Sequence, residues 1–252
     1  MSEIIVKVEK LSKSYSGQKV VKAISFEVKK GEIFGILGPN GAGKTTTLEM
    51  IETLRPIDSG KITVAGIDVK TNPEAVKRVI GVQPQTPAFQ DKQKLKEILE
   101  MFAATYGERI KPAEFLKEVS LEDRADSYAE ALSGGQRQRL SIAVALVHDP
   151  LVFFLDEPTT GLDPQARRNL WDLIKMVRDR GVTVIMTTHY MDEAELLCDR
   201  VAVMDDGKII ALDTPNNLIK ALLKKGFKKE APIEAANLED VFIDLTGKAL
   251  RD

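Results

Sequence analysis

Three runs of mainly apolar residues dominate the pattern of hydrophobic and polar positions along the chain. They are Glu32–Leu37, Leu151–Leu155 and Val182–Thr187. A strand with one solvated face would alternate between apolar and polar residues, so these runs predict strands buried on both faces of a parallel sheet. The residues after the first run follow a helical period, with an inner side made of Leu48, Ile51 and Leu54.

The remaining patterns divide the chain into a core with an insertion. Residues 1–86 alternate Val- and Ile-rich strands with turns, which predicts an antiparallel β edge joined to the first core strand. Residues 87–149 lack strand alternation and predict helices, with a core stripe at Leu95, Ile98, Leu99 and Phe102. Strand and helix alternation returns over residues 150–212, with a hairpin turn at Asp205–Gly207.

The predicted fold class is therefore α/β. Residues 1–86 and 150–212 form one core with an antiparallel β edge subdomain, and residues 87–149 form an inserted α-helical subdomain. Residues 213–252 are predicted to be a helical C-terminal extension.

Composition and charge are those of an ordinary globular protein. The 252 residues are 43% hydrophobic and 29% charged, which supplies enough apolar material for a sizeable core. A formal net charge of −2 gives no broad attraction to nucleic acid, so we expect no nucleic-acid partner. The single cysteine, Cys198, is expected to be a small buried apolar residue.

The sequence carries no signal for crossing a membrane. Its apolar runs are all shorter than the roughly 20 residues that a membrane helix needs, and its N-terminus lacks the pattern of a secretion signal. We therefore expect a cytoplasmic protein. Five lysines between Lys220 and Lys229 leave two interpretations open, namely contact with anionic lipid headgroups or a solvated helix end and linker.

A glycine-rich loop follows the first predicted strand and precedes the first predicted helix. It matches the pattern G-x-x-x-x-G-K-T, and with the next residue it comprises Gly38, Pro39, Asn40, Gly41, Ala42, Gly43, Lys44, Thr45 and Thr46. Backbone N–H groups in such a loop cradle phosphates, the lysine reaches the β- and γ-phosphates, and the threonine hydroxyl coordinates Mg²⁺. The loop predicts a nucleoside triphosphate site, with a glycine-rich turn and a solvated lysine as the alternative.

Titratable side chains follow the other two predicted strands. Asp156 and Glu157 come after the second run, and His189 comes after the third. Open α/β sheets place their ligands at the carboxyl ends of strands. Asp156 is suited to hold Mg²⁺, Glu157 to polarise an attacking water, and His189 to contact the γ-phosphate. The alternatives are carboxylates that cap the next helix and a histidine with a structural hydrogen bond.

A second anion site is predicted at Leu132-Ser133-Gly134-Gly135-Gln136. Ser133 is a good N-cap, and the two glycines expose N–H groups at the start of a helix, although a plain capped helix would give the same pattern. Together with Arg137–Arg139, this segment resembles the signature of the ATP-binding-cassette (ABC) transporter ATPases.

Other segments support the same resemblance, which covers nearly the whole chain. Thr159–Asp163 is similar to the D-loop of that family, Ile80–Gln85 is similar to its Q-loop, and His189 falls at its switch histidine. The resemblance implies a P-loop NTPase fold with a RecA-like core, and hydrolysis of ATP with Mg²⁺.

The resemblance also implies roles for individual residues. Tyr15 matches the aromatic residue that stacks on adenine, with an ordinary strand-edge tyrosine as the alternative. Gln85 matches the glutamine that addresses Mg²⁺, and Gln83 is a nearby rival. Asp163 belongs to the nucleotide-binding set. The signature would close over the γ-phosphate held by a second subunit, so that ATP lies between two chains arranged head to tail.

Finally, the resemblance implies partners and a direction of transport. A separate transmembrane permease would hold the chain at the inner face of the cell membrane. Gln85 to Phe102 would receive a short helix of that permease, or would be a mobile surface connection. Asn237–Gly247 resembles the ending of ABC-2-type exporter ATPases, which predicts export, although a generic amphipathic terminal helix is the alternative.

Two other classes of protein remain open from the sequence. A soluble ABC ATPase acting on DNA or the ribosome generally has two cassettes or a long coiled-coil insertion, and this sequence has one cassette and no sustained heptads. A P-loop kinase or other small NTPase is disfavoured by the Leu132 signature. Copurification with DNA or ribosomes would favour the first class, and a phosphorylated product would favour the second.

Overall fold

A mixed β-sheet forms the centre of the molecule. The computed structural model describes residues 3–90, 92–227 and 238–246. Its central sheet has the strand order β10-β9-β3-β8-β7-β6, in which β10 is antiparallel to β9 and the other neighbours are parallel. These strands are β3 (Ile33–Leu37), β6 (Ile80–Gln83), β7 (Val152–Asp156), β8 (Thr183–Thr188), β9 (Arg200–Asp205) and β10 (Lys208–Asp213).

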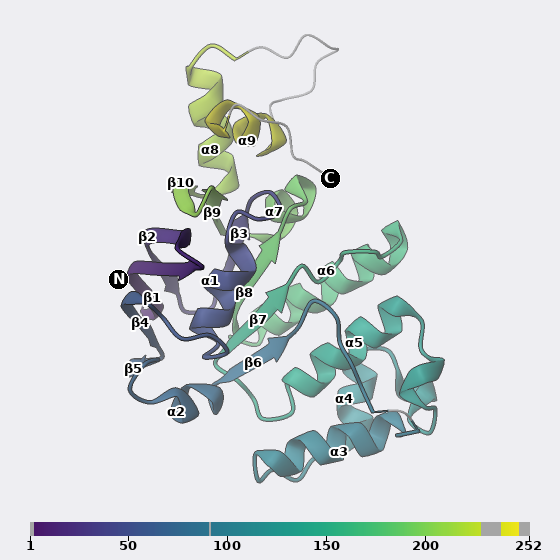
Figure 1. The fold of residues 1–252 in the computed structure, drawn as a ribbon. Coiled ribbons are helices and arrows are strands. Elements are labelled where there is room, and N and C mark those ends of the chain that lie inside the picture. Colours follow the sequence, from purple (N-terminus) through teal and green to yellow (C-terminus); the bar gives the residue numbers. More distant parts are fainter. Residues whose placement is uncertain (1–2, 91, 228–237, 247–252) are drawn as a thin grey trace.

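The predicted antiparallel edge is a sheet of its own. Its strand order is β2-β1-β4-β5, and all its neighbours are antiparallel. The strands are β1 (Ile4–Tyr15), β2 (Gln18–Lys29), β4 (Ser59–Val64) and β5 (Ile67–Asp68). Figure 1 shows this sheet beside the central one, with α1 close to both.

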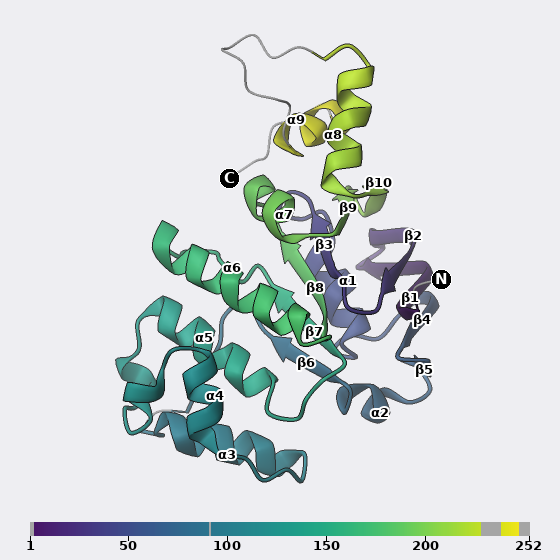
Figure 2. The ribbon, with the colours of Figure 1, turned by 180° about the vertical axis from the view of Figure 1, so that it is seen from behind.

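Helices cover both faces of the central sheet and extend beyond one edge of it. Figure 1 shows α3, α4 and α5 grouped beyond β6, and Figure 2 shows α6 on the face of the sheet opposite α1. The helices are α1 (Lys44–Ile51), α2 (Pro73–Lys77), α3 (Leu95–Thr105), α4 (Pro112–Glu118), α5 (Gly134–Ala145), α6 (Pro164–Asp179), α7 (Met191–Leu197), α8 (Pro215–Lys224) and α9 (Leu238–Thr246), with 3₁₀ turns at Glu122–Arg124 and Ala129–Ala131.

The three apolar runs are uninterrupted because β3, β7 and β8 are each buried on both faces. Phe153 and Leu155 of β7 belong to the cluster under α5, α6 and α7, whereas Phe154 of the same strand belongs to the cluster under α1 and the antiparallel sheet. All three side chains are fully buried. Alternate residues of a strand point to opposite faces, so two apolar layers require an apolar residue at every position.

Two apolar residues predicted to lie inside are exposed, and these expectations are wrong. Leu54 is 62% exposed because α1 ends earlier, in a Schellman motif in which the Leu54 amide donates to the Glu49 carbonyl and Thr53 has a φ of 67°. Leu151 is 44% exposed because β7 begins only at Val152. In both cases the misplaced residue lies at the end of a predicted run.

Other expectations about the fold are confirmed. Cys198 is buried, and the predicted hairpin turn joins β9 to β10, with φ of 45° at Asp206 and 74° at Gly207. No helix in the described ranges is both long and apolar enough to span a membrane. Of the lysine cluster, Lys228 and Lys229 lie outside the described residues, and so do residues 228–237 and 247–252 of the predicted extension.

A carboxyl group is buried where α1 ends. Glu52 is only 4% exposed, and burial raises the pKa of this carboxyl from 4.5 to about 8, with smaller contributions from the nearby carboxylates Asp156 and Glu49. Glu52 is therefore protonated at neutral pH in the folded protein and ionised in the unfolded chain.

We expect Glu52 to make the protein less stable as pH rises from about 4.5 to about 8, because in that range the folded state binds a proton that the unfolded state has released. Glu52→Gln removes this titration, so its stability should exceed that of the wild type increasingly toward pH 8, by up to about 1.4 kcal/mol per pH unit. Urea unfolding across this range measures the difference. Glu74→Gln, at an exposed acidic residue of α2, is the control, and an unchanged pH dependence in Glu52→Gln would contradict the prediction.

Candidate functional site

Four neighbouring strands end level with one another at one edge of the central sheet. Leu37 at the end of β3 is paired with Thr188 at the end of β8, and Thr187 is paired with Asp156 at the end of β7. Gln83 ends β6 beside Leu155. The segments that follow these four strands carry the residues predicted from the sequence to bind and hydrolyse a nucleotide.

The glycine-rich loop is folded tightly around its lysine. Lys44 Nζ donates to the carbonyl oxygens of Gly38 and Pro39, at 2.9 and 3.2 Å, and the side chain is 4% exposed. A Cβ on Gly38 would lie 2.1 Å from the Met204 carbonyl oxygen, so only glycine fits there. Ala42 is held by the hairpin turn between β9 and β10, because its carbonyl accepts a hydrogen bond from the Gly207 amide at 3.1 Å.

The two inner glycines of the loop, Gly41 and Gly43, meet different structural requirements. Gly43, the N-cap of α1, has a φ of 98°, and a Cβ there would lie 2.8 Å from the Val20 carbonyl oxygen. Gly41 has a φ of 82°, but an added Cβ would meet no described atom within 4 Å. Gly43 is therefore required by the nearby Val20 backbone as well as by its own conformation, whereas Gly41 supplies only the left-handed backbone conformation.

The structure brings most of the predicted catalytic and phosphate-binding residues to one hollow. Its volume is about 460 Å³. The loop contributes Asn40, Gly41, Gly43, Lys44, Thr45 and Thr46, the other strand ends contribute Gln85, Glu157, Thr160 and His189, and Val20 comes from β2. This edge of the sheet is the candidate ATP site.

The carboxylate of Glu157 lies between two potential cations in this hollow. Its Oε1 is 3.1 Å from Lys44 Nζ, and its Oε2 is 3.1 Å from His189 Nδ1. The backbone of Glu157 has a φ of 45°, which is strained for a residue with a side chain, and its amide donates to Thr187 Oγ1 at 3.0 Å. Glu157 is thus held in a costly conformation by the neighbouring strand β8.

Asp156 gathers hydroxyl groups from two elements. Its Oδ1 accepts hydrogen bonds from Thr45 Oγ1, at 3.2 Å, and from Thr187 Oγ1. Burial raises the pKa of the Asp156 carboxyl above its ordinary value, although both hydrogen bonds oppose that effect. Carboxylate and hydroxyl oxygens in one place are ligands of the kind that a hard divalent cation prefers.

The signature residues line a different and smaller hollow, of about 190 Å³. Ser133 caps α5, since its Oγ accepts from the Gln136 amide at 3.3 Å while Gln136 Oε1 accepts from the Ser133 amide at 3.0 Å. Gly134, Gly135 and Asp163 also line this hollow. The Asp163 side chain caps α6 by accepting from the amides of Gln165 and Ala166, both at 2.9 Å.

Gln85 and Gln83 have different surroundings in the structure, and Tyr15 lies apart from both. Gln85 lines the phosphate-loop hollow, whereas Gln83 is fully buried. Tyr15 is the last residue of β1 and pairs with Gln18 of β2 in the first hairpin. The residue is 38% exposed, and Lys13 Nζ lies 5.5 Å from the centre of its ring. Tyr15 is not one of the residues that line the phosphate-loop hollow.

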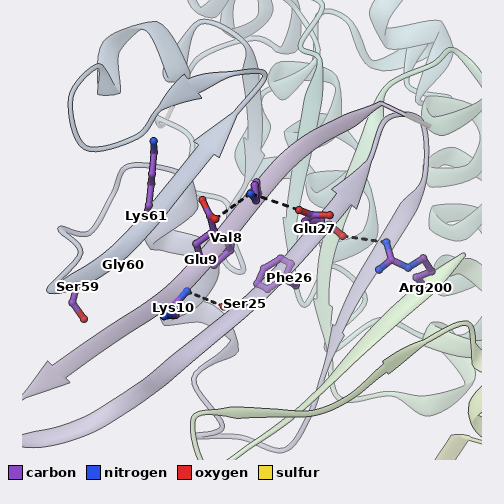
Figure 3. A pocket seen from close by; sticks show the side chains of 11 residues that line it. Val8, Glu9, Lys10, Ser25, Phe26, Glu27, Ser59, Gly60, Lys61 and Arg200 are labelled. Carbon is purple, nitrogen blue, oxygen red and sulfur yellow. Dashed lines mark hydrogen bonds and ion pairs between the residues drawn. The ribbon is translucent and has the colours of Figure 1, made fainter. Parts of the chain in front are cut away.

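The volume of a hollow does not by itself locate the chemistry in this molecule. A hollow of about 900 Å³ lies on the antiparallel sheet (Figure 3) and carries none of the predicted motifs. Its charged groups are engaged with their neighbours. Lys7 Nζ is 3.0 Å from Glu9 Oε1, and Arg200 Nη1 donates to the Glu27 carbonyl oxygen at 3.1 Å.

Sequence reasoning missed Val20, Thr160 and Thr187 as members of the site. Thr160 Oγ1 donates to Glu157 Oε2 at 3.4 Å, and Thr187 contacts both Asp156 and Glu157. The position of Thr187 near the end of a predicted strand was the only signal available for it. Val20 belongs to a distant strand and had no signal.

Comparison with known proteins agrees with this geometry. The sequence profile of the ABC transporter family matches residues 21–160. The chain belongs to the ABC transporter ATP-binding family. It is 43% identical to the linearmycin resistance ATP-binding protein LnrL of Bacillus subtilis (strain 168) over 223 residues, which cover 86% of this chain and 72% of that protein. It is 36% identical to the Nod factor export ATP-binding protein I of Burkholderia orbicola (strain AU 1054), across the full length of both.

Solved structures show the same ABC ATPase fold. A structure of the ATP-binding subunit of an ABC transporter superposes with a TM-score of 0.83 at 29% identity, covering 96% of this chain and 99% of that one. The dimeric ATP-binding cassette MJ0796, solved with ADP and Pi, gives a TM-score of 0.75 at 26% identity, covering 83% and 98%. The chain is an ABC transporter ATPase that binds ATP, and its fold is the α/β class predicted from the sequence.

We expect Gly38→Ala to lower the affinity for ATP more than about tenfold, because the new Cβ would have to displace the loop from the backbone of Met204. Fluorescent nucleotide titration measures this. Gly66→Ala is the matched control. Gly66 lies in open space at the turn after β4 and has a positive φ of 77°, so its substitution should cost about 1 kcal/mol of stability and change ATP affinity less than twofold. Wild-type affinity in Gly38→Ala would contradict this account of the loop.

Proposed function

We propose that this ABC ATPase is the motor subunit of an exporter, and that two copies close around ATP to drive a separate transmembrane permease. The observation that carries the proposal is the Glu157 carboxylate, held between Lys44 and His189 at the edge where the phosphate loop opens. The α/β core of residues 1–86 and 150–212 binds ATP in this proposal, the helical lobe of residues 87–149 presents the signature, and residues 213–252 are an extension.

ATP binding begins with the charges and N–H groups of the loop. The amides of residues 40–46 bind the phosphates at the N-terminus of α1, and Lys44 pairs with the β- and γ-phosphates. Tyr15 stacks on the adenine from the edge of the antiparallel sheet. Because phosphate oxygens compete with Glu157 for Lys44, nucleotide binding frees the carboxylate for its catalytic task.

Mg²⁺ fits the oxygen atoms around Asp156. Thr45 and Asp156 would hold it together with Gln85, and the ion would supply positive charge to offset the negative charge of the phosphates. Within the described residues, no cluster of three or more His, Cys, Asp and Glu side chains could hold a metal. A cation that keeps several waters and binds mainly to phosphate needs no such cluster.

Hydrolysis uses the carboxylate and the histidine together. Glu157 orients a water and accepts its proton, while His189, 3.1 Å from that carboxylate, contacts the γ-phosphate. Chemistry of this type depends on positioning and on charge stabilisation more than on covalent steps.

The signature acts on the nucleotide of a second copy. Ser133, Gly134 and Gly135 line a hollow separate from the phosphate loop of their own chain, and they sit at the N-terminus of α5, where an anion is favoured. Asp163 lies beside them. Two chains arranged head to tail would place each signature over the other's γ-phosphate. The dimer reported for the structurally similar cassette with ADP and Pi supports this arrangement.

Export and the permease are supported by the relatives. Proteins named for Nod factor export and for linearmycin resistance share 36–43% of their residues with this chain. Since relatives named for different cargoes are about equally similar, the permease selects the cargo. Residues 85–102 contact the permease in this proposal, which holds the ATPase at the inner face of the membrane. Nucleic acid has no part in it.

We expect Glu157→Gln to bind ATP at least as tightly as the wild type, because the neutral amide competes less with phosphate for Lys44. The turnover number should fall by at least about a hundredfold, because the general base is lost. The trapped ATP should hold the variant as a dimer, which analytical ultracentrifugation with ATP detects. Glu195→Gln, at an exposed acidic residue on α7, is the control and should behave as wild type. A Glu157→Gln protein that stays monomeric with saturating ATP would contradict the sandwich.

Mixing two inactive variants tests the head-to-tail arrangement directly. Lys44→Ala removes the phosphate contact and Ser133→Arg blocks the signature hollow, so each alone should be nearly inactive. A mixed dimer has one wild-type phosphate loop facing one wild-type signature. An equimolar mixture should therefore recover about a quarter of wild-type ATPase activity. No recovery with both variants folded would mean that each chain completes its own site.

A further inference from the structure

A buried pair of glutamines joins the central sheet to the signature helix. Gln83 at the end of β6 is fully buried, and Gln138 in the second turn of α5 is 7% exposed. Gln83 Nε2 donates to Gln138 Oε1 and to the Pro84 carbonyl oxygen, the latter at 3.2 Å. The Gln138 amide in turn reaches the backbone carbonyl of Gln85, at 3.5 Å. A buried amide that loses its partner destabilises the fold, so this contact is hard to break without consequence.

The other end of α5 is fixed to the same strand. A Cβ on Gly81 would lie 2.4 Å from the Ala145 carbonyl oxygen, so the two backbones touch with no side chain between them. Just after α5, His148 Nε2 is 2.9 Å from the Ile80 carbonyl oxygen, and its ring stacks on Tyr106. This end of the helix is therefore a close-packed pivot on β6.

The glutamine pair lies between this pivot and the signature. With a rise of about 1.5 Å per residue, Gln138 is about 10 Å from Ala145 and about 6 Å from Gly134 along the helix axis. A sideways shift at Gln138 is then about 1.6 times as large at Gly134, since α5 moves as a rigid rod. The position of Gln138 decides where the signature lies relative to the sheet.

We infer that Gln83 and Gln138 are positioning residues whose amide clasp sets the direction of α5 and couples the signature to Gln85. The inference rests on the proposed function in one respect, which is that the signature closes a partner's ATP site. Gln85 lines the phosphate-loop hollow, and the Gln138 amide bonds to its backbone. A displacement of Gln85 at the nucleotide thus reaches Ser133 and Gly135 through one hydrogen-bonded side chain.

The clasp has two bonded arrangements, which an apolar contact would lack. Gln83 Oε1 is buried and has no hydrogen-bond partner in the described part of the chain. If both amides turn by half a rotation, Gln138 Nε2 donates to Gln83 Oε1 and the pair stays bonded, while Gln138 no longer donates to Gln85 and Gln83 no longer donates to Pro84. The two arrangements correspond to a signature that is tied to Gln85 and a signature that is released from it.

Methionine substitutions test the clasp, because methionine keeps the length of the side chain and removes the amide. In a Glu157→Gln background, Gln83→Met and Gln138→Met should each weaken ATP-dependent dimerisation at least about tenfold, with ATP affinity of the monomer unchanged within about twofold. The double variant should lose no more than either single one, because the two residues act as a unit. Ultracentrifugation and nucleotide titration measure the two affinities.

Gln93→Met is the matched control. Its amide contacts Met101 in its own helical region and does not connect that region to the sheet. Dimerisation should be unchanged within about twofold. The clasp would be overturned if the losses of dimer affinity multiplied in the Gln83/Gln138 double variant. It would also be overturned if Gln93→Met lost as much dimer affinity as Gln83→Met or Gln138→Met.

Hydrogen exchange on the nucleotide-free chain separates failure of the clasp from failure of the proposed function. Gln138→Met should speed exchange of the amides of residues 136–140 at least about tenfold and leave those of residues 144–146 unchanged. If the Glu157→Gln background itself never dimerises with ATP, the proposed function fails, and exchange alone decides the clasp. Faster exchange confined to the first half of α5 then supports it, and unchanged exchange overturns it.

Discussion

A carboxylate withdrawn from water needs an opposite charge, and for Glu157 that charge is Lys44. Both side chains are less than a tenth exposed, and a buried ion that lost its partner would destabilise the protein by several kcal/mol. The ion pair joins the helix after β3 to the segment after β7, although β8 lies between these strands. The strained backbone of Glu157, the hydroxyl of Thr187 and the ring of His189 are all arranged around this one contact. In the proposed mechanism phosphate competes for the same lysine, so one interaction both stabilises the site and responds to the nucleotide.

Much of this arrangement could be predicted from the sequence because it depends on local patterns. The apolar runs identified the strands, and the loop at Gly38 and the acids at Asp156 and Glu157 identified the edge where they meet. What could not be predicted depends on residues far apart in the chain. Thr187 meets Asp156 only once the sheet has formed, and Gln83 finds Gln138 only after the lobe has packed on β6. Leu54 was wrongly predicted to be buried because the left-handed residue that ends α1 is Thr53. A glycine at that position would have indicated the end of the helix.

The phosphate-loop hollow and the signature hollow are connected through β6 and α5. The strand ends beside the phosphate loop, and the helix begins at Ser133, so the contact between them relates the two sites within one chain. Near the pivot, Gly81 allows the backbones to touch, and nearer the signature, polar side chains make the contact. Close packing without directional bonds suits a fixed point, whereas hydrogen bonds suit a contact that has more than one arrangement.

The turn between β9 and β10 has a consequence for the end of the chain. The Gly207 amide donates to Ala42 in the phosphate loop, and its carbonyl accepts from Lys22 at 2.8 Å. Strand β10 leads from this turn directly into α8, so a displacement of the C-terminal helices along β10 would act on the turn that is hydrogen-bonded to the phosphate loop. A tag, a fused domain or a binding protein attached there would therefore be connected to the phosphate loop through β10 and the Gly207–Ala42 hydrogen bond.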